Sequence, residues 1–429
     1  MSGKSIFDSF SSDVENPLKI TYSKVSHIFH DLITYDEVKN LVKRAVSLDA
    51  KLVNYHLRHY SEEKIGFLGS HLCLVVNYRR CGHHENEMRS FFLKTLPFDV
   101  PSQAAYIQEA GYFQKETECF RLLIPLMINN YKGKSWAPKC YIIKDYVLVF
   151  EDLKINGFSN QSRIFNEKTV KAALACIARF HASSLLTEEH TQGKSLKDLF
   201  PTLLKESQFK RIGLSYTWYS VAINLAVAIA DELGLDSSNI RQASERIFDI
   251  GEPSQTKRNV VSHGDLWSNN MVFDDNGRCN LVDFQLIRYS PLAHDVMQLL
   301  YLCTSKEFRR KNERRMIEYY YGILTDTLRL NNFKGNMISL EEVVQGAEEQ
   351  RFAALVTAVI FHPTVLMDGK TAGNIMNDTA AYESYYFKNR KPFVDEIMAN
   401  NDDYRDRLIE DVNELVELSL KVDNLPRPT

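Results

Sequence analysis

The chain has 429 residues, of which 44% are hydrophobic and 25% are charged, and its formal net charge at pH 7 is -3. This composition is typical of a globular protein with a large apolar core, built as two or three units or as one large fold of two lobes. The nearly neutral charge excludes the chain-wide basic field of many nucleic-acid-binding proteins, so we expect no nucleic-acid partner.

The N-terminal segment, residues 1–35, is polar and is predicted to be a lead-in without a secretory signal, since it lacks a continuous apolar run. Strands are predicted over 71–80 and 88–97, which are rich in β-formers. Apolar residues spaced by three and four predict a helix over 103–130. A hairpin is predicted over 140–153. The first half of the chain is therefore predicted to be rich in strands.

The pattern becomes helical from about residue 154. Apolar periodicity predicts helices over 167–186, 195–208, 214–233, 237–249, 291–303, 306–330, 340–361 and 403–422. One β-rich island interrupts them, where NVVSHG (259–264) precedes MVFDDNGRCNLVDF (271–284), a hairpin with its turn at Asp275-Asn276-Gly277. The sequence therefore predicts an α+β fold with a small β-rich lobe over 36–150 and a large helical lobe over 151–429, with a cleft between them.

The stretch 212–230 is uncharged over a full bilayer length and raises the alternative of a membrane span. It contains several polar residues and has no strong positive bias beside it, so we interpret it as a buried helix of the large lobe and expect no membrane span.

Seven cysteines are spread along the chain without any Cys-x-x-Cys pair. An odd number of cysteines, mostly inside apolar patterns, indicates free thiols in a reducing compartment, so we expect a cytoplasmic protein. Cys81, His83 and His84 in CGHHENE suggest a zinc site, but no second cluster with matching spacing accompanies them.

The decapeptide VSHGDLWSNN (261–270) places an acid, Asp265, five residues before an amide, Asn270. The hairpin that follows is predicted to return Asp283 to the side of Asn270, and a carboxylate with an amide oxygen suits a hard cation such as Mg²⁺. Asp265 is then free to accept a proton from an attacking hydroxyl, which is the division of labour in phosphoryl transfer. The alternative is that these three residues only form turns and caps.

HGDLWSNN, followed by LVDFQLIRYSPLAHDV (281–296), resembles the catalytic core of the insect ecdysteroid-kinase-like family. That family lies in the choline-kinase and aminoglycoside-phosphotransferase group, which shares the protein-kinase fold. FEDL (150–153) and ARFHASS (178–184) add weaker similarity, and the resemblance covers roughly 40–400. It implies a bilobal protein-kinase-like fold and an ATP- and Mg²⁺-dependent kinase that phosphorylates a small molecule.

The resemblance also implies roles for single residues of the catalytic region. Asp265 corresponds to the catalytic base, Asn270 and Asp283 to the metal ligands, and Asp295 to the acid that braces the catalytic loop. A helix-start acid without a catalytic role is the alternative for Asp295. We include His263 in this catalytic group and expect it to support the loop through hydrogen bonds.

In the small lobe, Lys94 in SFFLKTLP matches the strand lysine that contacts phosphates, and Glu116 matches its helix partner. The alternatives are a solvated surface lysine, and Glu109 or Glu118 of the same helix as partner. The backbone near Glu151 and Leu153 is expected to meet the adenine edge. Gly66 and Gly69 in GFLGSH stand where the phosphate-covering loop belongs, although they depart from the protein-kinase Gly-x-Gly-x-x-Gly.

The segment after Asp283 favours a small acceptor over a peptide. Only twelve positions separate Asp283 from Asp295, and no Ala-Pro-Glu motif follows, so a peptide-docking activation segment has little room. Gly264 stands where protein kinases have the arginine of His-Arg-Asp. Gln285 replaces the glycine of Asp-Phe-Gly, and whether it helps to bind a second metal is left open.

Aromatic residues of the large lobe are predicted to wall the acceptor site, with plain core packing as the alternative. The candidates are Tyr216, Trp218, Tyr219, Tyr382, Tyr385 and Tyr386. Trp267 and Asn269 are interpreted as family decoration. The family resemblance favours an ecdysteroid or another lipophilic alcohol as the acceptor. Two further interpretations are a choline or ethanolamine kinase and a catalytically silent pseudokinase. The intact residues of the site argue against the pseudokinase, namely Asp265, Asn270, Asp283 and Lys94.

Overall fold

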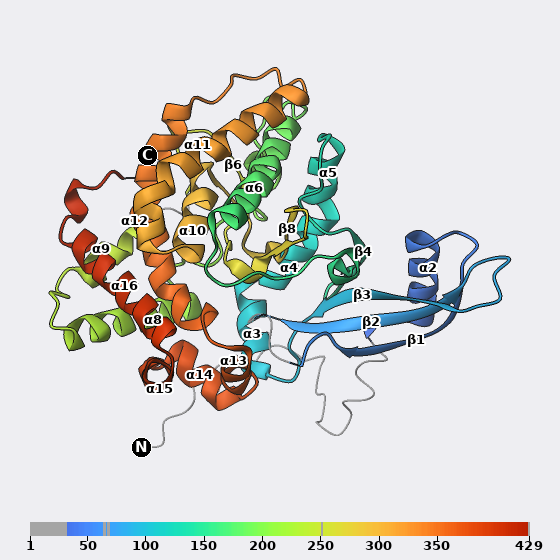
Figure 1. Ribbon diagram of the computed structural model, residues 1–429, viewed down its shortest axis with the longest axis horizontal. Helices are drawn as coiled ribbons and strands as arrows, with labels where there is room; N and C mark the ends of the chain where they lie inside the picture. The colour runs from blue at the N-terminus through green and yellow to red at the C-terminus, as the bar shows by residue number, and fades with distance from the viewer. Residues whose placement is uncertain (1–31, 63–65, 67–68, 250–251, 428–429) are drawn as a thin grey trace.

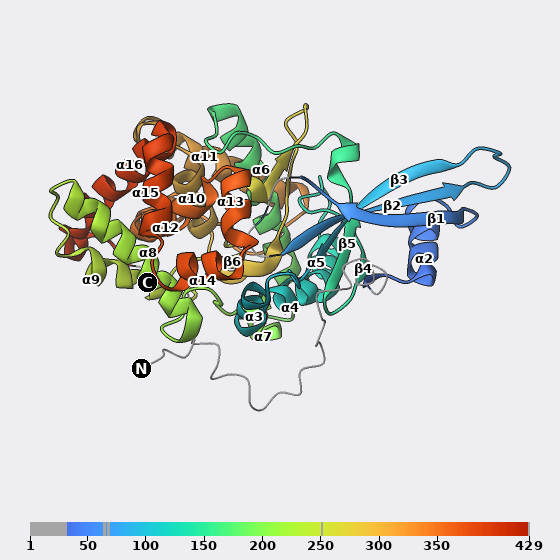
Figure 2. The ribbon, with the colours of Figure 1, turned by 90° about the horizontal axis from the view of Figure 1, so that it is seen from below.

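The computed structural model describes residues 32–62, 66, 69–249 and 252–427, which form two lobes (Figures 1 and 2). The smaller lobe is built on an antiparallel sheet and the larger one is mainly helical. The predicted bilobal α+β fold is therefore confirmed. The lead-in segment lies outside the described residues as far as residue 31.

The small lobe is a five-stranded antiparallel sheet with strand order β1-β2-β3-β5-β4. The strands are β1 (Lys51–His59), β2 (Ser70–Arg79), β3 (Glu87–Thr95), β4 (Cys140–Ile143) and β5 (Val147–Glu151). Helix α2 (Tyr35–Ala45) packs its apolar face on the sheet. The two predicted strands and the predicted hairpin are confirmed. β1 escaped prediction because it is an edge strand with mostly exposed side chains and no clean alternation.

The helix predicted over 103–130 is wrong as a single element. The chain forms α3 (Pro101–Ala110), α4 (Tyr112–Glu118), one π-helical turn over Cys119–Leu123, and α5 (Ile124–Asn129). Gly111 causes the break between α3 and α4, because it adopts a left-handed conformation with φ 75°. The break lets α4 pack against the large lobe at residues 284–286.

In the large lobe the long helix α12 packs along the shorter helix α10, and other helices surround this pair (Figure 1). The helices of this lobe are α6 (Glu167–Glu188), α7 (Leu196–Leu199), α8 (Gly213–Glu232), α9 (Ile240–Ser244), α10 (Ala293–Cys303), α11 (Lys306–Leu330), α12 (Leu340–Val365), α13 (Gly369–Met376), α14 (Thr379–Phe387), α15 (Lys391–Asn400) and α16 (Asp402–Ser419). The helix predicted over 195–208 is wrong beyond α7, because Pro201 disfavours a helical Phe200. The short helices α13, α14 and α15 were not predicted.

The predicted β-island is present as two small antiparallel pairs. β6 (Asn259–Ser262) pairs with β9 (Arg288–Pro291), and β7 (Met271–Phe273) pairs with β8 (Cys279–Leu281). The β7–β8 turn ends at Gly277, which has φ 72°. These pairs hold two loops, 263–270 and 282–287, at the side of the large lobe that meets the small lobe.

Helix α8 is long and apolar enough to cross a membrane, and so are α12 and α13 if that bent pair is counted as one. More than half of the α8 segment, 56%, is buried, and α8 packs against α9, α12, α14 and α16. It is thus a core helix of the large lobe in this fold, as the polar residues within it indicated.

Candidate functional site

The loop after β6 closes on itself through one amide side chain. Asn270 Nδ2 donates to the Asp265 carboxylate (2.8 Å) and to the Asp265 backbone carbonyl (2.8 Å). The five-residue spacing therefore brings the acid and the amide into direct contact. Both bonds use Nδ2, so the amide oxygen of Asn270 stays available for another ligand.

Asp283 follows β8 and returns to the same place, as the hairpin predicted. The Val282 N–H donates to the carbonyl of Asn270 (2.9 Å). Asp283 itself adopts φ 67°, a left-handed conformation that is uncommon outside glycine and that clusters at functional sites. This conformation redirects the chain from β8 into the one-turn helix Phe284–Leu286.

Lys94 joins the two lobes at this point. Its ammonium lies 2.6 Å from the Glu116 carboxylate on α4 and 2.6 Å from that of Asp283. Glu116 also accepts a hydrogen bond from the Phe284 N–H (3.1 Å). Burial lowers the pKa of Lys94, but the two carboxylates outweigh it and raise the pKa overall, so the side chain is charged. The predicted partner Glu116 is thus the one that Lys94 contacts.

Asp265 is buried, with 5% of its surface exposed, and shares the site with Asp283. Burial and the charge of Asp283 together raise the pKa of Asp265 to about 8. The carboxylates of Asp265 and the half-buried Asp283, with the Asn270 amide oxygen, form a hard-oxygen donor set, and this set fits Mg²⁺. In the described part of the chain no group of three or more His, Cys, Asp or Glu side chains is arranged to hold a metal ion. This statement covers Cys81, His83 and His84.

Asp295 lies behind the loop rather than in a cavity. It is fully buried and accepts hydrogen bonds from the N–H groups of His263 (2.7 Å) and Gly264 (3.0 Å) and from His181 Nε2 (3.0 Å). Burial alone raises the pKa of Asp295, but His181 outweighs it and the net pKa is lowered. His263 donates from Nε2 to the Val282 carbonyl (3.0 Å). Asp295 therefore holds the backbone of the loop at His263 and Gly264, and the His263 side chain connects the loop to Val282.

Gly264 leaves no room for a side chain. It adopts φ 76°, and a Cβ there would lie 2.5 Å from the Leu286 carbonyl oxygen and 2.8 Å from Nε of Arg288. Arg288 donates to the Gly264 carbonyl (3.3 Å) and forms an ion pair with Glu206. An arginine thus stands beside the loop, on β9, although position 264 itself cannot accommodate one.

Sequence analysis missed the outer supports of this loop. Gln298 accepts from the Leu266 N–H (2.9 Å) and donates to the Gly264 carbonyl (2.9 Å). His181, in the ARFHASS motif, and Arg288, in LIRYSPLAHDV, were quoted only as parts of motifs. Their positions within motifs that were already singled out were the signal that they support the site.

An interlobe cavity opens between the sheet and the β-island. Five of the six residues predicted to contact nucleotide line it, namely Gly66, Lys94, Glu116, Glu151 and Leu153. Gly69 does not, although it packs against the Lys94 side chain, where a Cβ would lie 3.4 Å from Cε. Asn270 and Asp283 also line this cavity, and Asp265 does not.

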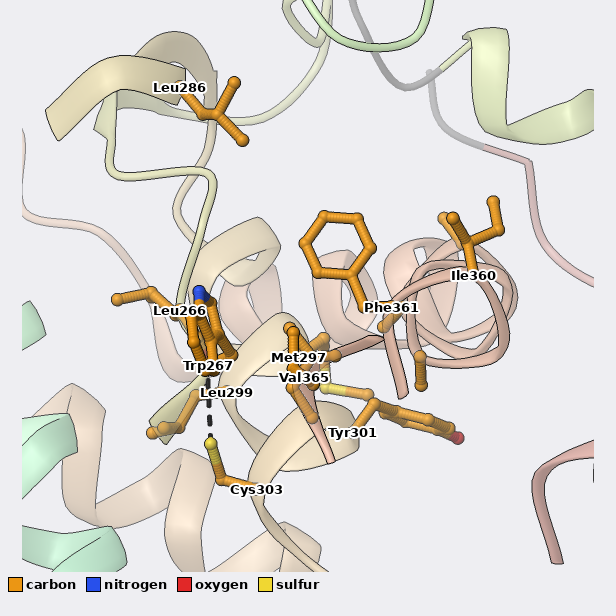
Figure 3. Close-up of a cluster of buried hydrophobic side chains, with 14 of the residues drawn as sticks. Leu266, Trp267, Leu286, Met297, Leu299, Tyr301, Cys303, Ile360, Phe361 and Val365 are labelled. Carbon is orange, nitrogen blue, oxygen red and sulfur yellow. Dashed lines mark hydrogen bonds between the residues drawn. The ribbon is translucent and has the colours of Figure 1, made fainter. Parts of the chain in front are cut away.

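A second, aromatic cavity lies on the other side of Asp283, with Asp265 in its wall. Figure 3 labels Trp267, Phe361 and, apart from them, Leu286, and all three line the cavity. Of the described residues that line it, Asp265 and Asp283 are the charged ones. The two cavities share Asp283, so a group bound in one can reach a group bound in the other.

The aromatic residues predicted to wall this cavity do so only in part. Trp218 and Tyr386 line it, whereas Tyr219 packs on Phe248 with ring centroids 4.7 Å apart. Tyr216, Tyr382 and Tyr385 do not line it either. The interpretation of Trp267 as decoration is wrong, because its ring forms part of the wall. Gln285 lines the aromatic cavity and not the interlobe cavity.

Comparison with curated sequences finds one relative, a kinase-like protein of Caenorhabditis elegans whose function is uncharacterised. The two chains are 24% identical over 160 residues, which is 37% of this chain and 41% of the relative. The match therefore spans less than half of that relative's length.

Comparison with solved structures finds small-molecule kinases at low identity. The choline kinase of Streptococcus pneumoniae is 12% identical, with a TM-score of 0.38, over 81% of this chain and 97% of that one. A spectinomycin phosphotransferase in complex with ADP and spectinomycin is 11% identical, with a TM-score of 0.40, over 92% and 99%.

A family model gives the clearest result. The ecdysteroid kinase-like model matches residues 66–333, which is more than half of the chain. This range includes Lys94, Glu116, the loop from His263 to Asn270, and Asp283. The chain belongs to the ecdysteroid kinase-like family.

Proposed function

We propose that this protein is an ATP- and Mg²⁺-dependent kinase that phosphorylates a hydroxyl group of a lipophilic small molecule. One observation carries the proposal: Asn270 is hydrogen-bonded to Asp265 and to the Val282 N–H next to Asp283, and Asp283 lines both an interlobe cavity and an aromatic cavity. The first cavity offers a charged lysine to phosphates, and the second offers a buried acid to an alcohol.

ATP is proposed to occupy the interlobe cavity. Lys94 binds its phosphates after exchanging the Asp283 carboxylate for phosphate oxygens, while Glu116 keeps the ammonium in position. Backbone groups near Glu151 and Leu153 meet the adenine edge, and Gly66 lies over the phosphates.

Asn270 and Asp283 are the residues that would hold Mg²⁺, through the amide oxygen and a carboxylate. When bound, the ion neutralises charge on the phosphate groups of the nucleotide. This assignment is supported by the oxygen-rich donor set and by the free amide oxygen of Asn270.

Asp265 is proposed to act as the general base. An acceptor hydroxyl in the aromatic cavity donates its proton to the Asp265 carboxylate while its oxygen forms a bond to the γ-phosphorus. The bond from that phosphorus to the bridging oxygen of ADP breaks, so that the products are the phosphorylated alcohol and ADP. Asp295 and Gln298 take no part in the transfer and hold the backbone that carries Asp265.

The acceptor is proposed to be an ecdysteroid or another lipophilic alcohol. The aromatic wall buries flat apolar surface favourably, and the wall has no acid besides Asp265 and Asp283 among its described residues. A choline-type acceptor would also use aromatic rings, through cation–π contacts. We propose a cytoplasmic location, which the seven free cysteines support.

The direct test is ATP consumption by the full chain with Mg²⁺ against a panel of ecdysone, other lipophilic alcohols, choline and ethanolamine. We expect turnover with a lipophilic alcohol and little with choline. Turnover with choline alone would replace the proposed acceptor class. No turnover with any acceptor, together with no binding of ATP and Mg²⁺, would indicate a pseudokinase.

A further inference from the structure

One polar group of the aromatic cavity has no partner within the protein. Gln208 lines this cavity and is 6% exposed, and its carboxamide oxygen Oε1 is buried without a hydrogen bond from any described residue. A buried acceptor left unsatisfied destabilises a fold, so such groups are rare in native proteins and call for an explanation.

Three hydroxyl groups of the cavity wall, those of Thr364, Tyr106 and Tyr112, differ from Gln208 Oε1 because they have partners within the protein. The Thr364 hydroxyl lies 3.0 Å from the Tyr385 hydroxyl, and the Tyr106 hydroxyl lies 3.2 Å from that of Tyr112. Gln208 Oε1 therefore differs from these hydroxyl groups in having no hydrogen-bond partner among the described residues.

The backbone of Gln208 is held firmly in place. The Glu206 carboxylate accepts hydrogen bonds from the N–H groups of Gln208 (2.5 Å) and Phe209 (3.0 Å). Glu206 is buried and pairs with Arg288, which in turn donates to the Gly264 carbonyl in the catalytic loop. Gln208 therefore has a defined position relative to Asp265, set by a chain of charged contacts.

We propose that Gln208 determines acceptor specificity by accepting a hydrogen bond from a second hydroxyl of the acceptor, apart from the hydroxyl that is phosphorylated. The inference rests on the proposed function and narrows its substrate class from lipophilic alcohols to lipophilic diols and polyols. An acceptor with a single hydroxyl places that hydroxyl at Asp265 and leaves Oε1 unsatisfied. An acceptor with two hydroxyls satisfies both groups.

The test uses the full chain and Gln208→Met, which keeps the length of the side chain and removes the amide. Binding of ecdysone, which has several hydroxyls, and of testosterone, which has one, is measured by calorimetry. We expect Gln208→Met to weaken ecdysone binding by about tenfold to a hundredfold, as expected for one buried hydrogen bond. Testosterone binding should change by less than about threefold, because only the Asp265 contact is used.

Thermal unfolding of the ligand-free variants separates recognition from a structural role. Since Oε1 has no partner in the protein, Gln208→Met and Gln208→Leu should keep the wild-type Tm or raise it. The control is Gln345→Met, the same change at an exposed position of α12, which should leave ecdysone binding within about twofold of wild type.

Equal weakening of both steroids, unchanged ecdysone binding, or a fall in Tm for both Gln208 variants would each overturn the inference. Failure of the proposed function has a different signature. If the wild type binds ecdysone through Gln208 but transfers no phosphate from ATP to any acceptor, the kinase proposal fails and the role of Gln208 in binding stands.

Discussion

Asp265 lies in the catalytic loop and Asp295 lies behind it on α10, and their surroundings shift their pKa values in opposite directions. Burial and the neighbouring Asp283 raise the pKa of Asp265 to about 8, whereas His181 and two backbone N–H groups stabilise ionised Asp295. Pairs of acids whose pKa values are pushed apart mark acid–base sites. The proton acceptor is therefore the acid in the cavity wall, and the acid behind the loop keeps its charge.

Asp265→Asn tests the proton acceptor. The substituted amide keeps an oxygen for the hydrogen bond from Asn270, so the loop should stay folded. It cannot accept a proton, and we expect turnover to fall at least ~100-fold with ATP affinity nearly unchanged. Steady-state kinetics and nucleotide titration measure the two effects. Wild-type turnover in this variant would remove Asp265 from the proposed mechanism.

Gly264→Ala tests the tight packing of the catalytic loop, with Gly277→Ala as its matched control. Both glycines have positive φ, but a Cβ at Gly277 meets no atom within 4 Å, whereas one at Gly264 meets the Leu286 carbonyl at 2.5 Å. We expect Gly277→Ala to cost about 1–2 kcal/mol of unfolding free energy and Gly264→Ala about 2–5 kcal/mol. Urea denaturation compares them, and equal losses would contradict the clash.

At the scale of elements, α4 connects the small lobe to two different parts of the large lobe. Glu116 reaches Lys94 and the Phe284 N–H, while the preceding Lys115 donates to the Lys205 carbonyl (2.6 Å) and the Ser207 hydroxyl (3.2 Å). The segment after α7 thus rests on α4 as well as on Arg288. The helix break at Gly111 makes this arrangement possible, since an unbroken helix would follow a different axis.

The buried Lys115 predicts a pH-dependent stability. Burial lowers its pKa to about 7, although the charge of Glu206 opposes this shift. In the unfolded chain the lysine pKa is about 10.4, so between these values only the unfolded chain binds the proton. The free energy of unfolding should therefore rise with pH above about 7, by up to roughly 1.4 kcal/mol per pH unit from this group.

Lys115→Met should remove that contribution. Urea denaturation of wild type and variant at several pH values between about 7 and 9 gives the difference in slope, and other titrating groups cancel in it. Parallel pH profiles for the two proteins would show that Lys115 stays charged in the folded state.

At the scale of the whole molecule, the Lys94 ammonium is a point where the lobes meet. It comes from β3 and contacts Asp283 of the large lobe across the interlobe cavity. Entry of ATP and Mg²⁺ into this cavity requires the contact to be exchanged for phosphate and metal contacts. Nucleotide binding is therefore coupled to the contact between the two lobes through the ion pair of Lys94 and Asp283.

Asp283→Asn tests this coupling, with Asp274→Asn in the same hairpin as control. Asp274 pairs with Arg278 in the β7–β8 turn and lines neither cavity. We expect Asp283→Asn to weaken ATP binding in the presence of Mg²⁺ at least about tenfold, since hydrogen bonds to charged groups contribute about 1.5–3 kcal/mol. Calorimetry with and without Mg²⁺ measures it, and an unchanged Mg²⁺ dependence would exclude Asp283 as a ligand.

Local sequence patterns were sufficient to predict the catalytic loop and most of the long helices of this protein. The hairpin was predicted to return Asp283 to the side of Asn270, and the structure contains this arrangement, because short loops and tight turns are set by neighbouring residues. Long helices such as α6, α11 and α12 were predicted for the same reason, since their apolar periodicity extends over many turns.

Tertiary structure alone decided which distant residues complete the site. Gln208, Leu286 and Phe361 come from separate parts of the large lobe and meet in one cavity, which no local pattern reports. Position 264 requires a glycine because Leu286 and Arg288, which the pairing of β6 with β9 brings next to it, occupy the space of a Cβ. By itself the sequence determined the catalytic loop and the alternation of elements, whereas packing between elements far apart in the chain decided the shape of the acceptor cavity and the supports beneath it.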